Sequence, residues 1–183
     1  MFKRNPMVGI SLRNGAIAGV LGMILFLGLY LMGRHPFLIP VYLDFRIILF
    51  GVLIFFTLRE FRDYFQKGML SFAQGMLMSF LFTLVFAVIG FFAVWGFGSW
   101  KTAFVSDYIS LTLESVKNFP PEIVKRIGQE AYEENIKALP MTRAIDLATL
   151  FLGQTFVISF FVSIIISVIL RRQPKTQTHG NTK

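Results

Sequence analysis

The chain of 183 residues is 55% hydrophobic with 22 Phe, and only 15% of its residues are charged, against about 25% in a typical soluble domain. It contains no cysteine, which excludes disulfide bonds, Cys-ligated zinc and lipid attachment to cysteine. The net charge of +8 would suit nucleic acid, but the basic residues flank apolar stretches and do not gather on a soluble domain, so we predict no nucleic-acid partner.

The first apolar stretch covers residues 14–33 and contains no charged side chain. A helix needs roughly 20 apolar residues to cross the bilayer, and this stretch is long enough, as are those at 69–97 and 147–170. A buried helix of a soluble protein seldom stays uncharged over such a length. These three stretches therefore predict an integral membrane protein.

The second expected span, residues 41–59, is weaker because its apolar part at 47–58 is short. Extending it back to Val41 includes Asp44 and Arg46, the only ionisable pair near a span interior. We expect both side chains to snorkel to the interface, although intramembrane charge also marks a candidate polar site. Because they are two residues apart, they should point to different faces of the helix and should not pair with each other.

These four spans predict an all-α membrane bundle that forms a single domain over residues 1–183. The segments between the spans fall on two sides, one with ten basic and two acidic residues, the other with eight of each. The positive-inside rule then places both termini in the cytoplasm and the segment between the third and fourth spans outside. The basic excess is expected to bind lipid headgroups.

The connection from Arg59 to Gly68 is expected to be a cytoplasmic elbow between the second and third spans. Just after it, Ser71 and Gln74 fit the capping box S-x-x-Q, in which each side chain satisfies a free backbone N–H at a helix start. This capping role is the favoured interpretation of Gln74. The alternative is a polar contact for a substrate or partner, because buried polar residues in spans are candidates for function.

The same region carries a resemblance to a known family. The run YFQKGMLSFAQGM, placed after FRD and before an apolar span, resembles the bacterial membrane proteins of domain of unknown function family 4199. The layout is similar too, with four spans, a short elbow and a long polar segment between the third and fourth spans. The family often has two adjacent glycines where this chain has Lys67 and Gly68. The resemblance implies a bacterial inner-membrane protein, but no catalytic or binding residue, because the family's function is itself unassigned.

Small residues recur at every fourth position in three of the spans, and residues four apart lie on one face of a helix. Lipid gives helices no hydrophobic reason to associate, so small side chains that permit close backbone approach favour packing. We expect these faces to pack against other helices, and the alternative is a hydroxyl-lined polar path. The positions are Gly15 and Gly19 in the first span, Ser71, Gly75, Ser79 and Thr83 in the third, and Thr155, Ser159, Ser163 and Ser167 in the fourth.

Residues 99–146 are too polar to cross the bilayer and are expected to form an external helical insert between the third and fourth spans. Proline disfavours helix in the residue before it, so Pro120-Pro121 should separate two helices. The second helix is expected to run through EIVKRIGQEAYEENIKAL and to end before Pro140. Such helices can cap the bundle, lie on the membrane or bind a partner. The polar tail, 171–183, is expected to be disordered.

The sequence favours a non-enzymatic membrane component that binds a protein partner or the bilayer, and the alternative is a small oligomeric transporter or channel subunit. His35 and His179 belong to no catalytic or metal-binding motif, so we expect no catalytic residue, cofactor or metal ion. Proton-coupled transport needs a shielded Asp, Glu or His, and the first, third and fourth spans contain none. The expected partners are the lipid bilayer and either another membrane protein or a second copy of the chain.

Overall fold

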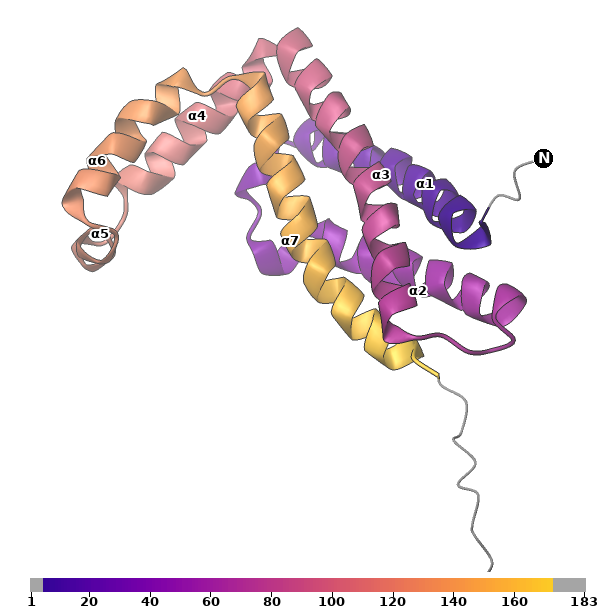
Figure 1. Cartoon of the computed structure of the whole chain (residues 1–183). Helices are drawn as coiled ribbons and strands as arrows, with labels where there is room; N and C mark the ends of the chain where they lie inside the picture. The colour runs from indigo at the N-terminus through magenta and orange to yellow at the C-terminus, as the bar shows by residue number, and fades with distance from the viewer. Residues whose placement is uncertain (1–4, 173–183) are drawn as a thin grey trace, which may run out of the picture.

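The computed structural model describes residues 5–172, and every regular element within them is a helix (Figure 1). The predicted disorder of the tail concerns residues that lie almost entirely outside this range. The long helices are α1 (Pro6–Leu31), α2 (Phe45–Phe65), α3 (Phe72–Trp100) and α7 (Ala144–Leu170). The shorter elements are α4 (Thr102–Lys117), α5 (Pro121–Ile127) and α6 (Gln129–Ala138), with single 3-10 turns at η1 (Pro36–Leu38), η2 (Val41–Leu43) and η3 (Leu139–Met141).

Local signals in the sequence start three of the long helices. The side chain of Asn5 accepts a hydrogen bond from the Met7 amide and Pro6 opens α1, where its missing N–H costs nothing. Asp44 caps α2 by accepting from the Arg46 amide at 2.9 Å. At the start of α3, the Ser71 hydroxyl accepts from the Gln74 amide, and the Gln74 side-chain oxygen accepts from the Ser71 amide. This is the capping box that the sequence indicates, and it occupies the carbonyl oxygen of Gln74.

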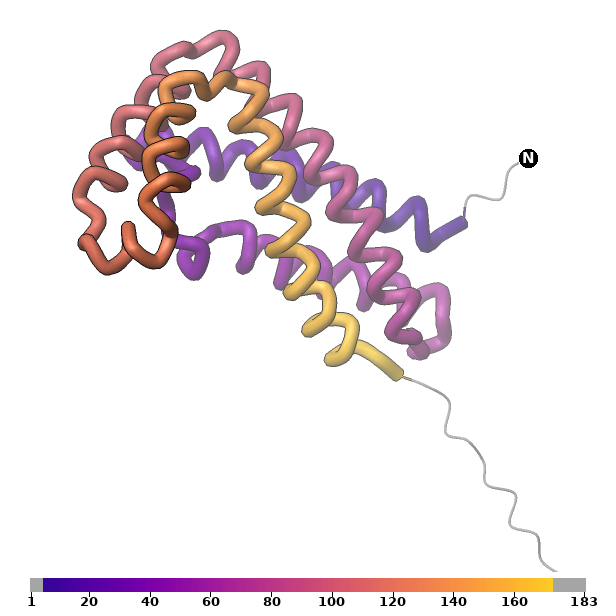
Figure 2. Tube along the Cα trace, turned by 60° about the vertical axis from the view of Figure 1, so that its left-hand side comes forward, coloured from indigo at the N-terminus to yellow at the C-terminus, as the bar shows by residue number. Residues whose placement is uncertain are grey.

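The four long helices pack into one bundle (Figures 1 and 2). Helix α3 lies against α1 and α7, and α2 lies against the same two helices. Helices α3 and α7 are antiparallel, because Gly75 lies beside Ser167 at one end and Gly98 lies beside Ala144 at the other. Arg13 of α1 reaches Glu60 near the end of α2, and Leu70, in the turn after α2, exchanges backbone hydrogen bonds with Arg172 just after α7. The start of α1 and the end of α7 therefore lie at the same end of the bundle.

Phenylalanine side chains fill the interior where these helices meet. Phe50 of α2, Phe82 and Phe86 of α3 and Phe151 of α7 are all fully buried. Phe50 meets Phe86 edge to face with ring centroids 4.7 Å apart, a geometry in which the positive ring edge faces the negative ring face. The core is therefore aromatic and continuous between α2, α3 and α7.

Three helices, α1, α3 and α7, are long and apolar enough to cross a membrane. Helix α2, with 21 residues, is shorter than these three, and the charged residues at both of its ends make it too polar to count among them. The prediction of an all-helical protein with helices that could cross a membrane is therefore confirmed.

The expected elbow from Arg59 to Gly68 is wrong in its extent. Helix α2 continues through Phe65, so the charges at its end lie on helical turns, and the connection is only the tight turn between Phe65 and Phe72. Lys67 and Gly68 both have positive φ, 50° and 81°, and the Gly68 amide donates to the Arg62 carbonyl at 2.9 Å. Left-handed backbone favours glycine. This is a physical reason for the two adjacent glycines that the resembled family often has where this chain has Lys67 and Gly68.

Helices α4, α5 and α6 form an arm (residues 102–138) that leaves the end of the bundle opposite to the termini (Figures 1 and 2). The helix break at Pro120-Pro121 is present. The single helix expected after it is wrong, because Gly128 adopts φ +93° and ψ 133° and divides it into α5 and α6. The helical pattern continues across Gly128, but a residue without Cβ can leave helical geometry at little cost.

Candidate functional site

The candidate polar pair, Asp44 and Arg46, lies where the start of α2 meets α7. Phe45 and Arg46 open the helix and Asp44 caps it, so the Arg46 side chain leaves the first turn toward its neighbour. Only 6% of the Arg46 side chain and 11% of the Asp44 side chain are exposed. The expectation that both side chains snorkel to the interface is wrong, because the bundle itself encloses them.

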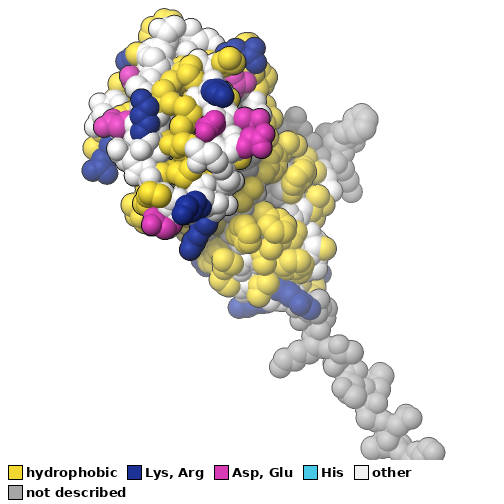
Figure 3. Space-filling model, turned by 90° about the vertical axis from the view of Figure 1, so that its left-hand side faces the viewer, with side chains coloured by type: hydrophobic (Ala, Val, Ile, Leu, Met, Phe, Trp, Pro, Cys, Tyr) yellow, Lys and Arg dark blue, Asp and Glu magenta, His cyan; other side chains and the backbone are white. Residues whose placement is uncertain are grey.

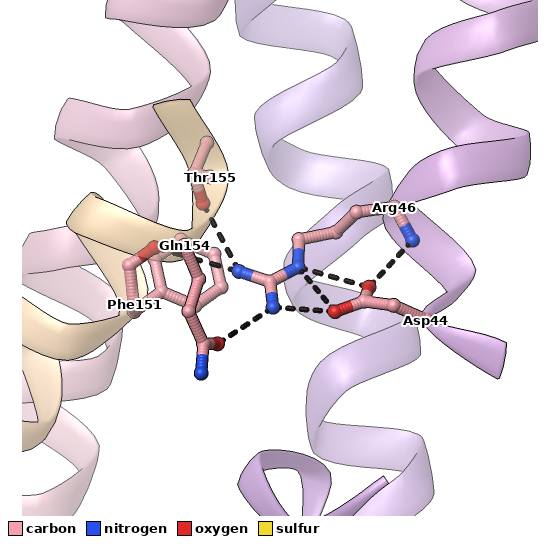
Figure 4. A network of polar contacts seen from close by, with 5 residues as sticks. All are labelled: Asp44, Arg46, Phe151, Gln154 and Thr155. Carbon is pink, nitrogen blue, oxygen red and sulfur yellow. Dashed lines mark hydrogen bonds and ion pairs between the residues drawn. The ribbon is translucent and has the colours of Figure 1, made fainter. Parts of the chain in front are cut away.

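Figure 4 shows the Arg46 guanidinium between the Asp44 carboxylate on one side and α7 on the other. Its Nε atom donates to both carboxylate oxygens of Asp44, at 2.9 and 3.0 Å, and its Nη2 atom donates to one of them. The expectation that the two residues would not pair is also wrong. It assumed that Asp44 is helical, whereas Asp44 is the extended residue before the helix, and its side chain folds back over the first turn.

Helix α7 supplies the remaining acceptors for this guanidinium. Nη2 donates to the Gln154 side-chain oxygen at 2.8 Å, and Nη1 donates to the Thr155 hydroxyl at 3.1 Å and to the Phe151 carbonyl at 3.4 Å. The guanidinium also lies over the Phe151 ring, 4.9 Å from its centroid. Thr155 lies about three turns from the start of α7, so the network is well inside the helix.

An arginine has five N–H groups, and each one here has an acceptor. A cavity of about 200 Å³ lies next to the network, between Arg46 and apolar side chains such as Phe37, Val41 and Ile158. A further anion entering it would have to displace a hydrogen bond that is already made. The arrangement therefore acts as a clasp between α2 and α7, which we call the Arg46 clasp (Asp44, Arg46, Phe151, Gln154 and Thr155).

Gln74, the third candidate polar residue, lies far from this clasp. It is in the first turn of α3, at the bundle end where Leu70 and Arg172 exchange backbone hydrogen bonds. Its carbonyl oxygen serves the capping box. The structure therefore does not bring Gln74 together with Asp44 and Arg46.

The small-residue faces lie where the long helices approach most closely. A Cβ added to Gly15 would lie 2.6 Å from the Phe82 carbonyl oxygen, and one added to Gly75 would lie 2.7 Å from the Ser167 hydroxyl. Thr83 and Ser159 are hydrogen-bonded to each other through their hydroxyl groups. All of the hydroxyl-bearing members of these faces within α3 and α7 are buried, namely Ser79, Thr83, Thr155, Ser159, Ser163 and Ser167.

The remaining small positions fit the same geometry. A Cβ on Gly19 would meet the Ile89 side chain at 2.9 Å, which brings α1 close to α3. Ser71 stands outside the interface, because it caps the start of α3. Ser79 and Ser167 have buried hydroxyls without a hydrogen-bond partner among the described residues, so they contribute size more than polarity.

A second polar cluster, which the sequence did not single out, joins the arm to the bundle. The Tyr30 hydroxyl at the end of α1 donates to Asp107 of α4 at 2.8 Å, and the Lys101 ammonium lies 5.2 Å from the Tyr30 ring centroid. His35 stacks on Phe104 at 4.7 Å, and its Nε2 atom lies 3.1 Å from the Phe104 carbonyl oxygen. We call this group the arm joint (Tyr30, His35, Lys101, Phe104 and Asp107).

Burial controls the charge of His35 at this joint. Only 5% of the residue is exposed, and removal from water holds the pKa of His35 below its usual value, although Phe104 and Asp107 act in the other direction. The carbonyl contact requires a proton on Nε2, so Nδ1 is the unprotonated nitrogen of the neutral ring. A cavity of about 400 Å³ opens beside the joint, with Tyr30, His35, Lys101 and Asp107 on its wall.

No pattern in the sequence could have revealed these contacts. Tyr30 and Asp107 are 77 positions apart, and Arg46 and Thr155 are 109 apart. Each is an ordinary polar residue in or beside a helix until the chain folds. Within residues 5–172, no three His, Asp or Glu side chains lie close enough together to share a metal ion.

Comparison with known proteins adds one finding. The model of a family described as "Protein of unknown function (DUF4199)" matches residues 13–172, which includes α2 to α7 and most of α1. No curated protein and no solved structure gives a match.

Proposed function

The chain belongs to this family of proteins of unknown function (DUF4199), and we propose that it is a non-enzymatic component of the bacterial inner membrane. In this proposal the bundle of four helices spans the bilayer. The arm lies outside and binds either the bilayer surface or a protein partner.

The packing of α2 supports a fourth span. Its 21 residues have a length of about 32 Å, and the apolar part of a bilayer is about 30 Å thick. It lies between α1 and α7 like a full member of the bundle. Its charges do not oppose insertion, because Arg46 is held inside by the clasp and the others lie in the last two turns.

The distribution of basic residues supports the orientation. Arg13, Arg59 and Arg62 lie at the bundle end where α1 starts and α7 ends, whereas the arm leaves the opposite end. The positive-inside rule favours the cytoplasm for the end with the basic excess. Both termini are then cytoplasmic and the arm is external.

One observation carries the assignment of function to the arm. None of residues 105–146 is buried, although the structure describes all of them. In the bundle, by contrast, the aromatic core and most of the small-residue positions are buried. A helical segment without a core of its own gains most from being covered by another surface, because its apolar side chains otherwise remain in water.

Single-cysteine variants test the topology, because the natural chain has no thiol. Lys125→Cys in the arm should react with a membrane-impermeant maleimide on intact cells, and Gln66→Cys in the turn after α2 should react only after the cells are opened. The reverse pattern would overturn the orientation. Photocrosslinkers at Val116 and Leu139, on the wall of a cleft of about 430 Å³ in the arm, then report whether lipid or a single protein lies there.

A small oligomeric transporter or channel subunit is the second candidate. The observation in its favour is a groove of about 210 Å³ at the α3–α7 interface, where the hydroxyls of Thr83, Ser159 and Ser163 meet phenylalanine side chains. In liposomes under a pH gradient, proton flux that disappears in Asp44→Asn but survives in Glu133→Gln would favour this candidate. We expect no such flux, because Asp44 is bound to Arg46.

A further inference from the structure

The tip of the arm combines exposed apolar side chains with basic ones. Phe119, Ile123 and Ile127 lie on or next to α5 and are 38%, 39% and 46% exposed. Lys117, Lys125 and Arg126 lie among them, against one acidic residue, Glu122. Apolar side chains beside basic ones are typical of segments that lie in the headgroup region of a membrane.

The returning helix of the arm has the opposite charge. Helix α6 carries Glu130, Glu133 and Glu134 against Lys137. The arm is thus divided, with a basic tip and an acidic helix α6. Figure 3 shows the side of the arm that lies on the left in Figure 1, where hydrophobic side chains run between charged ones. Such a division favours one orientation beside a charged surface.

The arm is also placed where a bilayer surface would be. Figures 1 and 2 agree that it runs away to the side of the bundle, and it does not extend the long axes of α3 and α7 outward. The arm joint fixes this direction, because Tyr30 and His35 hold the first turns of α4. If the bundle spans the bilayer, the arm therefore lies over the neighbouring lipid.

We propose that the tip of the arm, residues 117–127, binds the outer leaflet through acidic lipid headgroups. Phe119, Ile123 and Ile127 enter the headgroup region while Lys117, Lys125 and Arg126 pair with lipid phosphates. A second copy of the chain fits less well, because a symmetric contact between two tips would bring like charges together. This assignment rests on the proposed topology and names the surface that the arm binds.

Spin labels on single cysteines measure this contact in the full-length protein. Ile123→Cys places a label on α5, and Glu134→Cys places the matched control on α6. Each labelled protein is reconstituted into phosphatidylcholine vesicles with or without phosphatidylglycerol. Accessibility to oxygen, which concentrates in apolar surroundings, is compared with accessibility to a water-soluble nickel complex.

We expect the label at position 123 to favour oxygen in the acidic vesicles and the label at position 134 to favour nickel in both. Adding Lys125→Gln and Arg126→Gln to the Ile123→Cys protein should shift its label toward nickel. Equal nickel access at positions 123 and 134 in acidic vesicles would overturn the proposal. The proposal would also be overturned if the label at position 123 were protected from nickel equally with and without phosphatidylglycerol and with and without the two glutamine substitutions. Spin–spin broadening that shows a second copy at the tip would overturn it too. Because these contacts are read in vesicles, they are measured separately from the side on which the arm lies in cells.

Discussion

The bundle and the arm are built from the same kind of element but are stabilised in different ways. In the bundle, helices approach so closely that Gly15 has no room for a Cβ, and the buried Arg46 has an acceptor for every N–H. In the arm, α4 and α6 leave an apolar cleft of about 430 Å³ between them, and no residue from 105 to 146 is buried. The arm joint marks the border between the two regions.

The difference shows which region is complete by itself. Closely packed helices, with a buried arginine whose N–H groups all have acceptors, leave little for a partner to add, and substitutions there should lower the stability of the bundle through lost packing. An open cleft and exposed apolar side chains gain from being covered. The bundle is therefore expected to set the stability of the protein, and the arm its interactions.

The largest effect should come from removing Arg46. Arg46→Ala leaves Asp44 buried without its counter-charge, so we expect the free energy of unfolding to fall by about 3–5 kcal/mol. Arg13→Ala is the matched control, because the Arg13 side chain is 57% exposed beside Glu60 and such pairs contribute less than about 1 kcal/mol. Equal losses for the two variants, measured by denaturant titration in detergent, would show that the clasp does not hold α2 to α7.

The next effect concerns close helix approach. In Gly15→Ala the new methyl group would meet the Phe82 carbonyl oxygen, a backbone atom that cannot rotate away, and we expect a loss of about 1–3 kcal/mol. Gly153→Ala in α7 has open space at the same kind of helical position and should be neutral or stabilising by up to about 1 kcal/mol. If both substitutions behave alike in the same titration, α1 and α3 are not in close contact.

At the arm joint, stability should depend on pH through His35. The folded protein holds the pKa of His35 below its usual value, so below about pH 6.5 the unfolded chain takes up the proton first. Acidification from neutral pH should therefore lower the melting temperature until the pKa of the folded state is reached.

His35→Phe is the control for this pH dependence. It keeps a ring on Phe104 but cannot take up a proton, so its melting temperature should change less between about pH 7.5 and about pH 5.5 than that of the natural chain. An unchanged slope in the variant would assign the pH dependence to other groups.

The smallest effect on the bundle should come from Gly128→Ala in the arm. The backbone of Gly128 is one that side chains rarely adopt, so alanine should favour the continuous helix from α5 to α6 that the sequence pattern indicates. Because none of residues 105–146 is buried, we expect the unfolding of the bundle to change by less than about 0.5 kcal/mol. The distance between spin labels at positions 123 and 134 should increase. A loss as large as that of Gly15→Ala would show that the two regions are coupled.

Much of the fold could be predicted from the sequence because its signals are local. Charge-free stretches identify α1, α3 and α7 as membrane helices, since insertion depends on the composition of about 20 consecutive residues. The capping box of Ser71 and Gln74 and the break at Pro120-Pro121 also depend only on neighbouring residues. The spacing of small residues indicated which faces could approach closely, but not which helix each face would meet.

The sequence by itself determined the membrane class, the long helices and the basic excess at one end, because each follows from residues close together in the chain. Only the tertiary structure decided that Arg46 turns inward, because four of its acceptors depend on where α7 places Phe151, Gln154 and Thr155 and on how Asp44 folds over the helix start. It also decided that His35, an unremarkable residue in a turn, is buried against Phe104. For His35, and for the acceptors of Arg46 on α7, the partner lies far along the chain, and its position is set by packing that no local pattern records.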